Sequence, residues 1–482
     1  MTVDEVLAKV PTGQFIGGSF VVTDATFPVY NPATGEVLAE VSDGGPEHAR
    51  AALNAACDVG GQWAATEPRV RGEILRRAFE LIVERGDDYA TLMTLEMGKP
   101  LAEARGEVGY GAEFFRWFSE EACRIEGRWT TAPVGGNRLL TMKQPVGPVY
   151  AITPWNFPLA MGTRKIGPAL AAGCTVVIKP AGATPLTMLY LMQTLKDAGV
   201  PDGVVNCVVS SRSSQVSEPI LTDPRLRKLT FTGSTEVGRG LLAQAANGVL
   251  RTSMELGGNA PFAVLADADV DHAVAGAMPA KFRNNGEACT AANRFYVHRA
   301  VVGDFTSKLV EAAEGLVVGD GMEAGVTLGP LIDADAVAKV QELVDDAVAK
   351  GARVLTGGRA VDGPGNFFQP TVLADVPRDA RLLREEIFGP VAPVVTVDSD
   401  EEAIALSNET EFGLMAYVYS RDISRVLKAA ERLESGMVAV NTGVVSNPAA
   451  PFGGVKQSGL GREGSHEGLD EYLEIKYLGI TL

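Results

Sequence analysis

Histidine and cysteine are scarce in this chain, which has 4 His and 5 Cys among its 482 residues. The cysteines lie at positions 57, 123, 174, 207 and 289, and neither residue type forms a cluster with metal-ligand spacing. Transition-metal centres need such clusters, so the sequence predicts no metal site. An odd number of widely spaced cysteines also disfavours a disulfide framework and is typical of the reducing cytosol.

Basic residues are outnumbered, with 43 Lys and Arg against 60 Asp and Glu and a formal net charge of −17. This balance disfavours nucleic acids and anionic membranes as partners, because both are bound through clustered Lys and Arg. The longest mostly apolar run lies between Lys165 and Lys179, is too short to span a bilayer, and is interrupted by Pro168. The first residues lack the charged and apolar regions of a signal peptide, so we expect a cytoplasmic protein.

Strand-like and helix-like segments alternate along the chain from about residue 147. The predicted strands cover Val149–Thr153, Thr175–Lys179, Val204–Val209 and Leu229–Thr232, and the helices between them end near Gly173 and Gly199. A second alternating region begins near Ala260 and continues past residue 440. Such alternation predicts βαβ units, and therefore two α/β lobes built on parallel sheets with function at the carboxyl ends of the strands.

Two glycine motifs could bind a phosphate, and their contexts differ. FTGSTEVG (231–238) follows a predicted strand and begins a helix-like run, so the helix amides and Ser234 could hold a phosphate, although a plain strand–helix turn explains the motif as well. The G-x-G-x-x-G match at Gly459–Gly464 has no predicted strand before it and too little chain after it for a βαβ unit. We interpret this second motif as a closely packed turn.

Three residues could carry chemistry. Cys289 lies in a polar segment with positive charge nearby, although an isolated cysteine is more often a small buried hydrophobe. Glu255 lies in MELGGN (254–259), where it is either a solvated strand-end residue or a general base with a raised pKa. Asn156 lies in PWNFP (154–158), where it forms either an Asx turn or an amide donor to a developing oxyanion.

Taken together, these segments resemble the aldehyde dehydrogenase superfamily over essentially the whole chain. The blocks that carry the resemblance occur in the order of the family: PWNFP (154–158), IKPA (178–181), FTGSTEVG (231–238), MELGGN (254–259), the segment around Cys289, EEIFGP (385–390) and PFGGVKQSGLGREG (451–464). Within the superfamily, the KFRN segment before the cysteine and NTGVVSN (441–447) are similar to the succinate-semialdehyde dehydrogenase group.

The resemblance implies a role for each matching position. Cys289 would be the nucleophile, Glu255 the base that activates the deacylating water, and Asn156 an oxyanion donor with the Cys289 amide. The positions that would hold a nicotinamide cofactor are Thr153, Pro154, Trp155, Lys179, Ala181, Gly182, Gly233, Ser234, Glu386 and Phe388. Arg164, Arg283 and Ser446 would bind the carboxylate of the substrate.

The resemblance also implies an architecture. It predicts a doubly wound dinucleotide-binding domain over residues 1–126 and 146–256, a catalytic α/β domain over 257–456, and a small β oligomerisation element over 127–145 with a C-terminal segment over 457–482. We expect a homodimer or homotetramer. The expected reaction is NAD(P)-dependent oxidation of succinate semialdehyde. Glutarate semialdehyde, a broad aldehyde range, an acyl-transferring relative and a non-catalytic binding protein on the same fold are the alternatives.

Three positions depart from the common pattern. Gly182 stands where many members carry a Glu that binds the ribose, which favours NADP over NAD, with Arg212 as a partner for the 2′-phosphate. Glu287 replaces the usual Gln two residues before the nucleophile, and we expect its charge to raise the pKa of Cys289. Ala291 replaces a second cysteine found in some relatives, so no redox switch is predicted at the nucleophile.

Overall fold

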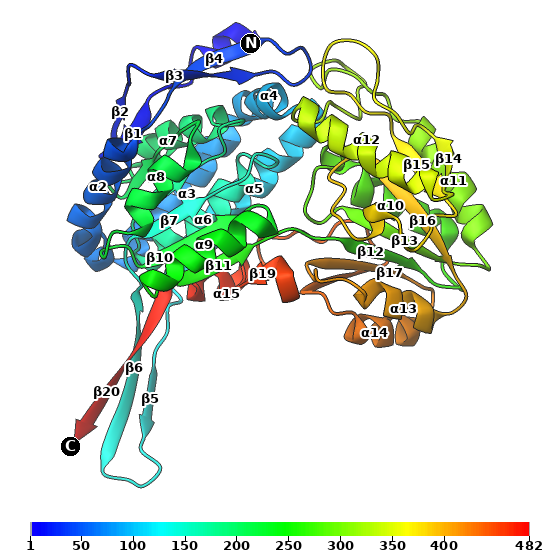
Figure 1. The fold of residues 1–482 in the computed structure, drawn as a ribbon. Helices are drawn as coiled ribbons and strands as arrows, with labels where there is room; N and C mark the ends of the chain where they lie inside the picture. The colour runs from blue at the N-terminus through cyan, green and yellow to red at the C-terminus, as the bar shows by residue number, and fades with distance from the viewer. Residues whose placement is uncertain (1, 482) are drawn as a thin grey trace.

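The computed structural model describes residues 2–481, and two α/β lobes and a projecting β arm dominate its shape (Figure 1). The lobe built mainly from the first half of the chain contains an eight-stranded sheet, and the other contains a seven-stranded sheet. The predicted α/β class with parallel sheets is therefore confirmed. No helix within residues 2–481 is long and apolar enough to cross a membrane.

The eight-stranded sheet has the strand order β19-β11-β10-β7-β8-β9-β1-β2. Its five central strands are parallel, and β19, β1 and β2 add antiparallel edges. The strands are β1 (Gln14–Ile16), β2 (Ser19–Val21), β7 (Val149–Ile152), β8 (Val176–Lys179), β9 (Val205–Cys207), β10 (Lys228–Thr232), β11 (Arg251–Glu255) and β19 (Gly459–Leu460). The strands expected from the sequence are all present, with ends that differ by one or two residues.

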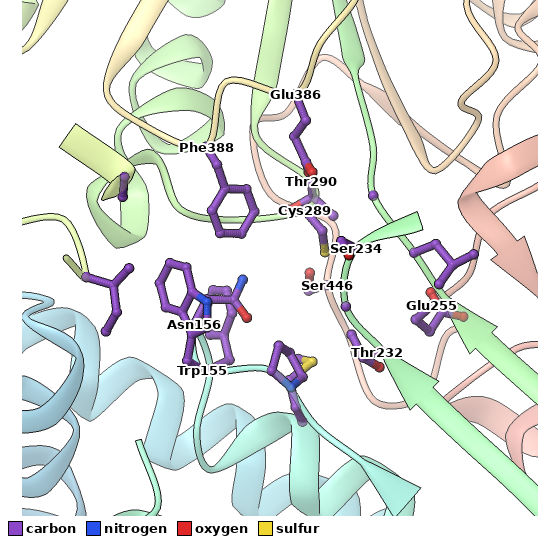
Figure 2. Close-up of a pocket in the computed structure, with 18 of the residues that line it drawn as sticks. Trp155, Asn156, Thr232, Ser234, Glu255, Cys289, Thr290, Glu386, Phe388 and Ser446 are labelled. Carbon is purple, nitrogen blue, oxygen red and sulfur yellow. The ribbon is translucent and has the colours of Figure 1, made fainter. Parts of the chain in front are cut away.

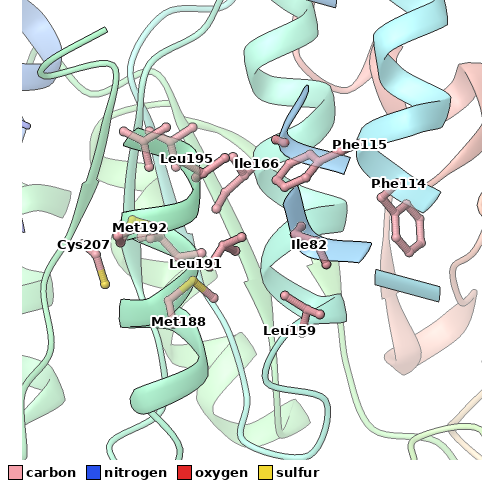
Figure 3. Packing of buried hydrophobic residues seen from close by; sticks show 14 of the residues in the cluster. Ile82, Phe114, Phe115, Leu159, Ile166, Met188, Leu191, Met192, Leu195 and Cys207 are labelled. Atoms are coloured by element: carbon pink, nitrogen blue, oxygen red, sulfur yellow. The ribbon is translucent and has the colours of Figure 1, made fainter. Parts of the chain in front are cut away.

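Helices cover both faces of this sheet because alternate residues of its strands are apolar on both sides. Val149 and Ala151 belong to one hydrophobic core, whereas Tyr150 between them belongs to another. Figure 3 shows part of the first core, where Ile166 and Leu191 pack among side chains from several helices. The helices of this lobe are α2 (Pro46–Ala65), α3 (Pro68–Glu84), α4 (Gly86–Met97), α5 (Leu101–Glu121), α6 (Ala160–Ala172), α7 (Leu186–Ala198), α8 (Ser213–Leu221) and α9 (Thr235–Asn247).

The predicted helix ends are confirmed at two glycines. α6 ends at Gly173 and α7 at Gly199, and both glycines have a left-handed backbone, with φ of 94° and 93°. Glycine adopts this conformation without the steric cost that a Cβ atom would add, so it ends a helix at a defined residue. The chain then turns directly into β8 and β9, whose carboxyl ends lie on the same edge of the sheet.

The seven-stranded sheet has the order β14-β15-β16-β13-β12-β17-β18 and is parallel except for β14. Its strands are β12 (Ala260–Val264), β13 (Ala292–His298), β14 (Arg353–Thr356), β15 (Thr371–Ala374), β16 (Val391–Val397), β17 (Met415–Tyr419) and β18 (Met437–Val440). Its helices are α10 (Val270–Lys281), α11 (Val302–Glu314), α12 (Ala334–Ala349), α13 (Asp400–Asn408) and α14 (Ile423–Arg432), with the short 3₁₀ turns η1 (Arg283–Gly286) and η2 (Arg381–Leu383).

The arm is a three-stranded antiparallel sheet that projects from the molecule with the C-terminus near its tip (Figure 1). It pairs β6 (Asn137–Pro145) with both β5 (Arg128–Thr131) and β20 (Leu473–Thr481), so segments far apart in sequence meet here. The remaining elements are α1 (Val3–Leu7), the hairpin of β3 (Thr26–Tyr30) and β4 (Val37–Ser42), η3 (Lys456–Ser458) and α15 (Ser465–Asp470).

Candidate active site

A cavity of about 330 Å³ lies between the two lobes and is lined by residues from both. Its walls include Glu255 at the end of β11, Asn156 just after β7, and Cys289 just before β13. Figure 2 shows Cys289 and Asn156 directed into the same space, with Glu255 farther along. The three candidates for chemistry therefore meet in one cavity, although more than 130 residues separate the first from the last.

A sharp turn positions Cys289. Asn284, Asn285 and Gly286 have positive φ values of 57°, 60° and 77°, so the chain reverses between α10 and the cysteine. A Cβ atom on Gly286 would lie 2.4 Å from the Gly389 carbonyl, so only glycine fits there. After the cysteine, the Thr290 carbonyl accepts a 2.8 Å hydrogen bond from the Tyr417 hydroxyl. The segment that carries Cys289 is thus fixed on both sides.

The Cys289 thiol is neutral in this cavity. Burial raises its pKa to about 12, the charges of Glu386 and Glu255 add to the rise, and those of Arg164 and Arg283 oppose it. The two arginines therefore place positive charge near Cys289, but their effect on its pKa is smaller than that of burial. The thiol must lose its proton before it can act as a nucleophile.

Asn156 has an amide donor available to the cavity. Its side-chain nitrogen donates to the Glu287 carbonyl at 2.9 Å, which uses one of the two N–H bonds and fixes the amide plane. The Asn156 carbonyl in turn accepts from Asn284 Nδ2 at 3.1 Å. A fixed N–H donor in the same cavity as Cys289 is an arrangement that would stabilise a negative oxygen if the thiolate attacked a carbonyl group.

Glu255 is buried at the end of β11, and its Oε2 atom has no hydrogen-bond partner. Burial raises its pKa well above the ordinary value and the negative charge of Glu463 adds to this, whereas Arg164 and Lys165 oppose it. The glycine turn at Gly459 allows close approach, because a Cβ atom there would lie 1.9 Å from the Met254 carbonyl. An unpartnered carboxyl group with a raised pKa is a strong base once it is ionised.

Arg164 lines the cavity and makes a buried ion pair. Its Nε atom pairs with Glu463, whose other oxygen accepts from Lys165 Nζ at 2.5 Å. The guanidinium lies 4.0 Å from the centre of the Phe452 ring, and one terminal nitrogen has no partner. The pair is buried, so it differs from an exposed surface ion pair, which contributes little to stability. One side of the guanidinium remains available to an anion.

Arg283 and Ser446 line the same cavity as Arg164, so the three residues expected at the substrate carboxylate are brought together. Arg283 makes no ion pair with any residue in the described part of the chain, and its Nε atom is buried without a partner. Its guanidinium lies 5.6 Å from the Phe157 ring centre. Arg283 lowers the pKa of nearby Glu103, but burial prevails there and the Glu103 pKa stays above its ordinary value.

The expected cofactor residues divide into two groups. Pro154, Trp155, Gly233, Ser234, Glu386 and Phe388 line the cavity. Thr153, Lys179, Ala181, Gly182 and Arg212 do not. Lys179 is nevertheless buried at the end of β8, where burial lowers its pKa to about 8 and its ammonium contacts the Pro180 carbonyl at 3.1 Å.

The lining residues fit a nicotinamide dinucleotide. Trp155 and Phe388 form an edge-to-face pair with ring centres 5.5 Å apart, which leaves aromatic walls for a flat ring. Ser234 caps α9, a helix of 13 residues whose N-terminus favours a phosphate. Glu386 accepts from the Gly258 amide at 3.2 Å, and its other oxygen has no hydrogen-bond partner among residues 2–481, so it can accept from a ribose hydroxyl.

Gly182 and Arg212 lie near the same corner of the molecule. A Cβ atom on Gly182 would lie 3.4 Å from the Ser210 carbonyl, and Arg212 is exposed two residues farther along. Asp43 accepts from Ser210 Oγ at 2.9 Å and from the Ser211 amide at 3.0 Å. Burial would raise the Asp43 pKa, but these hydrogen bonds and the Arg212 charge hold it below its ordinary value. A carboxylate that the sequence did not indicate therefore faces this corner.

The effect expected of Glu287 on the Cys289 pKa stays a prediction. The Oε1 atom of Glu287 accepts from the Ile332 amide at 3.0 Å, and burial raises the Glu287 pKa well above the ordinary value. Burial and the charges of Glu386 and Glu255 are the main causes of the raised Cys289 pKa.

The structure adds site residues that sequence reasoning missed. Lys165 and Glu463 form the buried network beside Glu255, and Lys99 and Glu107 contact the Asn156 loop. The segment around Glu463, GLGREGSHEG, is polar and gives no signal that this charged residue is buried. Within residues 2–481, no group of three or more His, Cys, Asp or Glu residues is arranged to hold a metal.

Comparison with known proteins identifies similar chains. Residues 20–478 match the aldehyde dehydrogenase family. The chain is 59% identical over 445 residues to succinate-semialdehyde dehydrogenase from Paenarthrobacter nicotinovorans, covering 92% of this chain and 99% of that protein. It is 52% identical over 466 residues to glutarate-semialdehyde dehydrogenase from Pseudomonas aeruginosa, covering 96% of each. A solved structure described as an E. coli NADP-dependent enzyme superimposes with a TM-score of 0.97 at 51% identity, covering 98% and 99% of the two chains.

Proposed function

The chain belongs to the aldehyde dehydrogenase family, and on that premise we propose that it oxidises succinate semialdehyde to succinate with a nicotinamide cofactor. The observation that carries the proposal is that half-buried Arg283, which has no carboxylate partner among residues 2–481, lines the same cavity as Cys289. A substrate with an aldehyde at one end and a carboxylate at the other would satisfy both groups.

The first step is attack by sulfur. Deprotonated Cys289 forms a bond to the aldehyde carbon, and the carbonyl electron pair moves to oxygen, giving a thiohemiacetal anion. The free N–H of Asn156 and the backbone amide of Cys289 are the donors for this oxygen. One such donor contributes about 3–4 kcal/mol to the stability of the transition state.

The second step leaves a thioester on Cys289. A bound nicotinamide cofactor supplies the acceptor for the hydride that leaves the former aldehyde carbon. Trp155 and Phe388 would flank its ring, Ser234 and the start of α9 would hold its pyrophosphate, and Glu386 would hold a ribose. Glu255 then takes a proton from water, the resulting hydroxide attacks the thioester, and the acid and the Cys289 thiolate separate.

The site residues favour an acidic aldehyde. Arg grips a carboxylate through paired hydrogen bonds, and Arg164 and Arg283 each have a guanidinium nitrogen without a partner. Ser446 offers a hydroxyl at the same cavity wall. Glutarate semialdehyde remains the second candidate, because one added methylene changes binding by only about 1–3 kcal/mol, and one similar protein has that name.

We also propose that the cofactor is NADP in preference to NAD. Gly182 removes a carboxylate that would repel the 2′-phosphate, and Arg212 lies at the same corner. The similar E. coli structure is described as NADP dependent. The negative charge of Asp43 at this corner opposes the preference for NADP and limits its size.

We further propose that the protein is cytoplasmic and forms a homo-oligomer whose subunits pair through the arm of β5, β6 and β20. The domain boundaries are proposed to be those predicted from the sequence.

Replacing the sulfur tests the function directly. Cys289→Ser should abolish reduction of the cofactor by succinate semialdehyde, because a serine hydroxyl is a far weaker nucleophile at neutral pH. The dissociation constant for NADP, measured by fluorescence titration, should stay within about threefold of wild type. Undiminished turnover by Cys289→Ser would rule out the thioester route. A product that stays bound to an added thiol, in place of free acid, would favour the acyl-transferring alternative.

A further inference from the structure

A second buried ion pair lies behind Asn156, outside the cavity lining. Lys99 is only 1% exposed, and its ammonium pairs with Glu107, which is 4% exposed. A buried ammonium group is costly unless charged or polar groups surround it, so the contacts of Lys99 indicate what it holds in place. Neither residue lines the cavity, and neither has a place in the reaction as described above.

Lys99 contacts the Asn156 loop in two ways. Its Nζ atom donates to the Asn156 main-chain carbonyl at 2.9 Å, and it lies 4.2 Å from the centre of the Phe157 ring. The ammonium therefore contacts the residue that carries the oxyanion donor and the residue after it. Arg283 contacts the same ring from a longer distance of 5.6 Å. The position of Phe157 thus couples this loop to the proposed carboxylate site.

Glu107 contacts the end of the same loop. Its Oε1 atom accepts hydrogen bonds from the Leu159 amide at 3.0 Å and the Ala160 amide at 3.1 Å. These amides lie at the start of α6, where main-chain donors have no partner inside the helix. The ion pair therefore holds the second half of this loop, which covers residues 153–159: Lys99 contacts its middle at Asn156, and Glu107 contacts its end.

We propose that Lys99 is a positioning residue for the oxyanion donor Asn156, acting as a pair with Glu107. Asn156 donates one N–H to the Glu287 carbonyl, so the direction of the other N–H depends on where the main chain of Asn156 lies. Lys99 fixes that main chain through a charged hydrogen bond in a region without solvent, where such a bond is strong. The inference rests on the proposed function, because it concerns the oxygen formed when Cys289 attacks.

The experiment is a double-mutant cycle on Lys99 and Asn156. Lys99→Met removes the charge and keeps the length of the side chain, and Asn156→Ala removes the donor itself. Removing an oxyanion donor lowers kcat by roughly 10²–10³-fold. Lys99→Met leaves the donor present but misdirected, so we expect the single-turnover rate of cofactor reduction to fall about 10- to 100-fold.

The double variant separates positioning from general loss of structure. If Lys99 acts through Asn156, then Lys99→Met/Asn156→Ala should be no slower than Asn156→Ala alone, within about threefold. Independent effects would instead multiply. The dissociation constant for NADP, measured by fluorescence titration, should change less than threefold. Multiplied losses, or an equal loss in cofactor binding, would overturn the proposal.

Lys228→Met is the matched control. Lys228 is also a buried lysine, it also contacts a carboxylate (Glu471, at 3.4 Å), and its ammonium lies 5.0 Å from the Tyr472 ring centre. Both variants therefore lose a buried charge and a ring contact, but Lys228 lies away from Asn156. The proposal requires that Lys99→Met be at least tenfold slower than Lys228→Met at similar melting temperature.

Unpaired Glu107 could prevent the single variant from folding, because breaking a buried ion pair is strongly destabilising. Lys99→Met/Glu107→Gln leaves no unpaired charge and keeps an acceptor for the Leu159 and Ala160 amides. This variant should fold and show the same fall in rate. Full activity in it would overturn the proposal. If wild-type protein oxidises no aldehyde, the proposed function fails first, whereas normal wild-type turnover with a fast Lys99→Met variant contradicts only the positioning role.

Discussion

Arg283→Met provides the sharpest test of the proposed substrate, because it removes the charge and keeps an apolar stem beside Phe157. Arg283 has no ion pair within residues 2–481, so its charge is available to a ligand, whereas Arg164 already pairs with Glu463. Removing one partner of a desolvated charge pair costs about 2–5 kcal/mol. We take about 3 kcal/mol, since Arg164 remains, which corresponds to roughly a 100-fold fall in kcat/KM.

The assay compares two aldehydes of equal length. Succinate semialdehyde and butanal both have four carbons, and only the first carries a carboxylate. Initial rates with saturating NADP should show the 100-fold loss for succinate semialdehyde and less than about a threefold loss for butanal. The ratio of the two kcat/KM values is insensitive to the amount of active enzyme. If Arg283→Met damages both aldehydes equally, the carboxylate is not bound by Arg283, and the reasoning about its unpaired charge is wrong.

Three further predictions concern the nucleophile, the backbone and the cofactor. Because the Cys289 pKa is raised to about 12, the thiolate fraction should rise about tenfold per pH unit from pH 7 to 9. The rate at which iodoacetamide alkylates Cys289 in cofactor-free protein should rise in the same way, and a plateau above pH 8 would contradict this. Gly459→Ala should lower the free energy of unfolding in urea by at least about 2 kcal/mol, since φ is 137° and the new Cβ atom would meet a carbonyl group. The control is Gly106→Ala in α5, where open space surrounds the glycine. This variant should raise the free energy of unfolding by up to about 1 kcal/mol. Gly182→Glu should weaken NADP binding at least tenfold and leave NAD binding within threefold in fluorescence titrations, and equal weakening of both would exclude repulsion of the 2′-phosphate.

The local elements of the fold could be predicted because their signals are local. A run such as Val176–Lys179 is apolar on both faces, and the glycines at 173 and 199 end the helices on either side of it. The G-x-G-x-x-G match at Gly459–Gly464 could also be interpreted from its local context. Its first residue pairs with Glu255 in an antiparallel edge strand, so the motif does not form the strand–turn–helix unit that binds a dinucleotide.

The supporting residues of the site could not be predicted, because their partners are far away in sequence. Glu463 reaches Lys165 across 298 positions, and Lys99 reaches Asn156 across 57. Nothing in either local segment indicates which of many charged residues it will meet. The same holds for Glu287. Its position two residues before Cys289 gave no indication that its carboxylate accepts from the Ile332 amide.

The charges of the cavity also explain why an anionic substrate would be selected. Burial raises the pKa of Glu386 to about 7 and that of Glu255 well above its ordinary value, so near neutral pH these carboxyl groups carry less negative charge than exposed glutamates do. Glu463 has a lowered pKa, because Arg164 and Lys165 outweigh the effect of its burial, and it is committed to those two cations. The charge of Arg283 then has no carboxylate partner within residues 2–481. A substrate carboxylate would supply that missing partner. An uncharged aldehyde of the same length would leave the arginine unpaired in the cavity, which would weaken its binding relative to the carboxylated substrate.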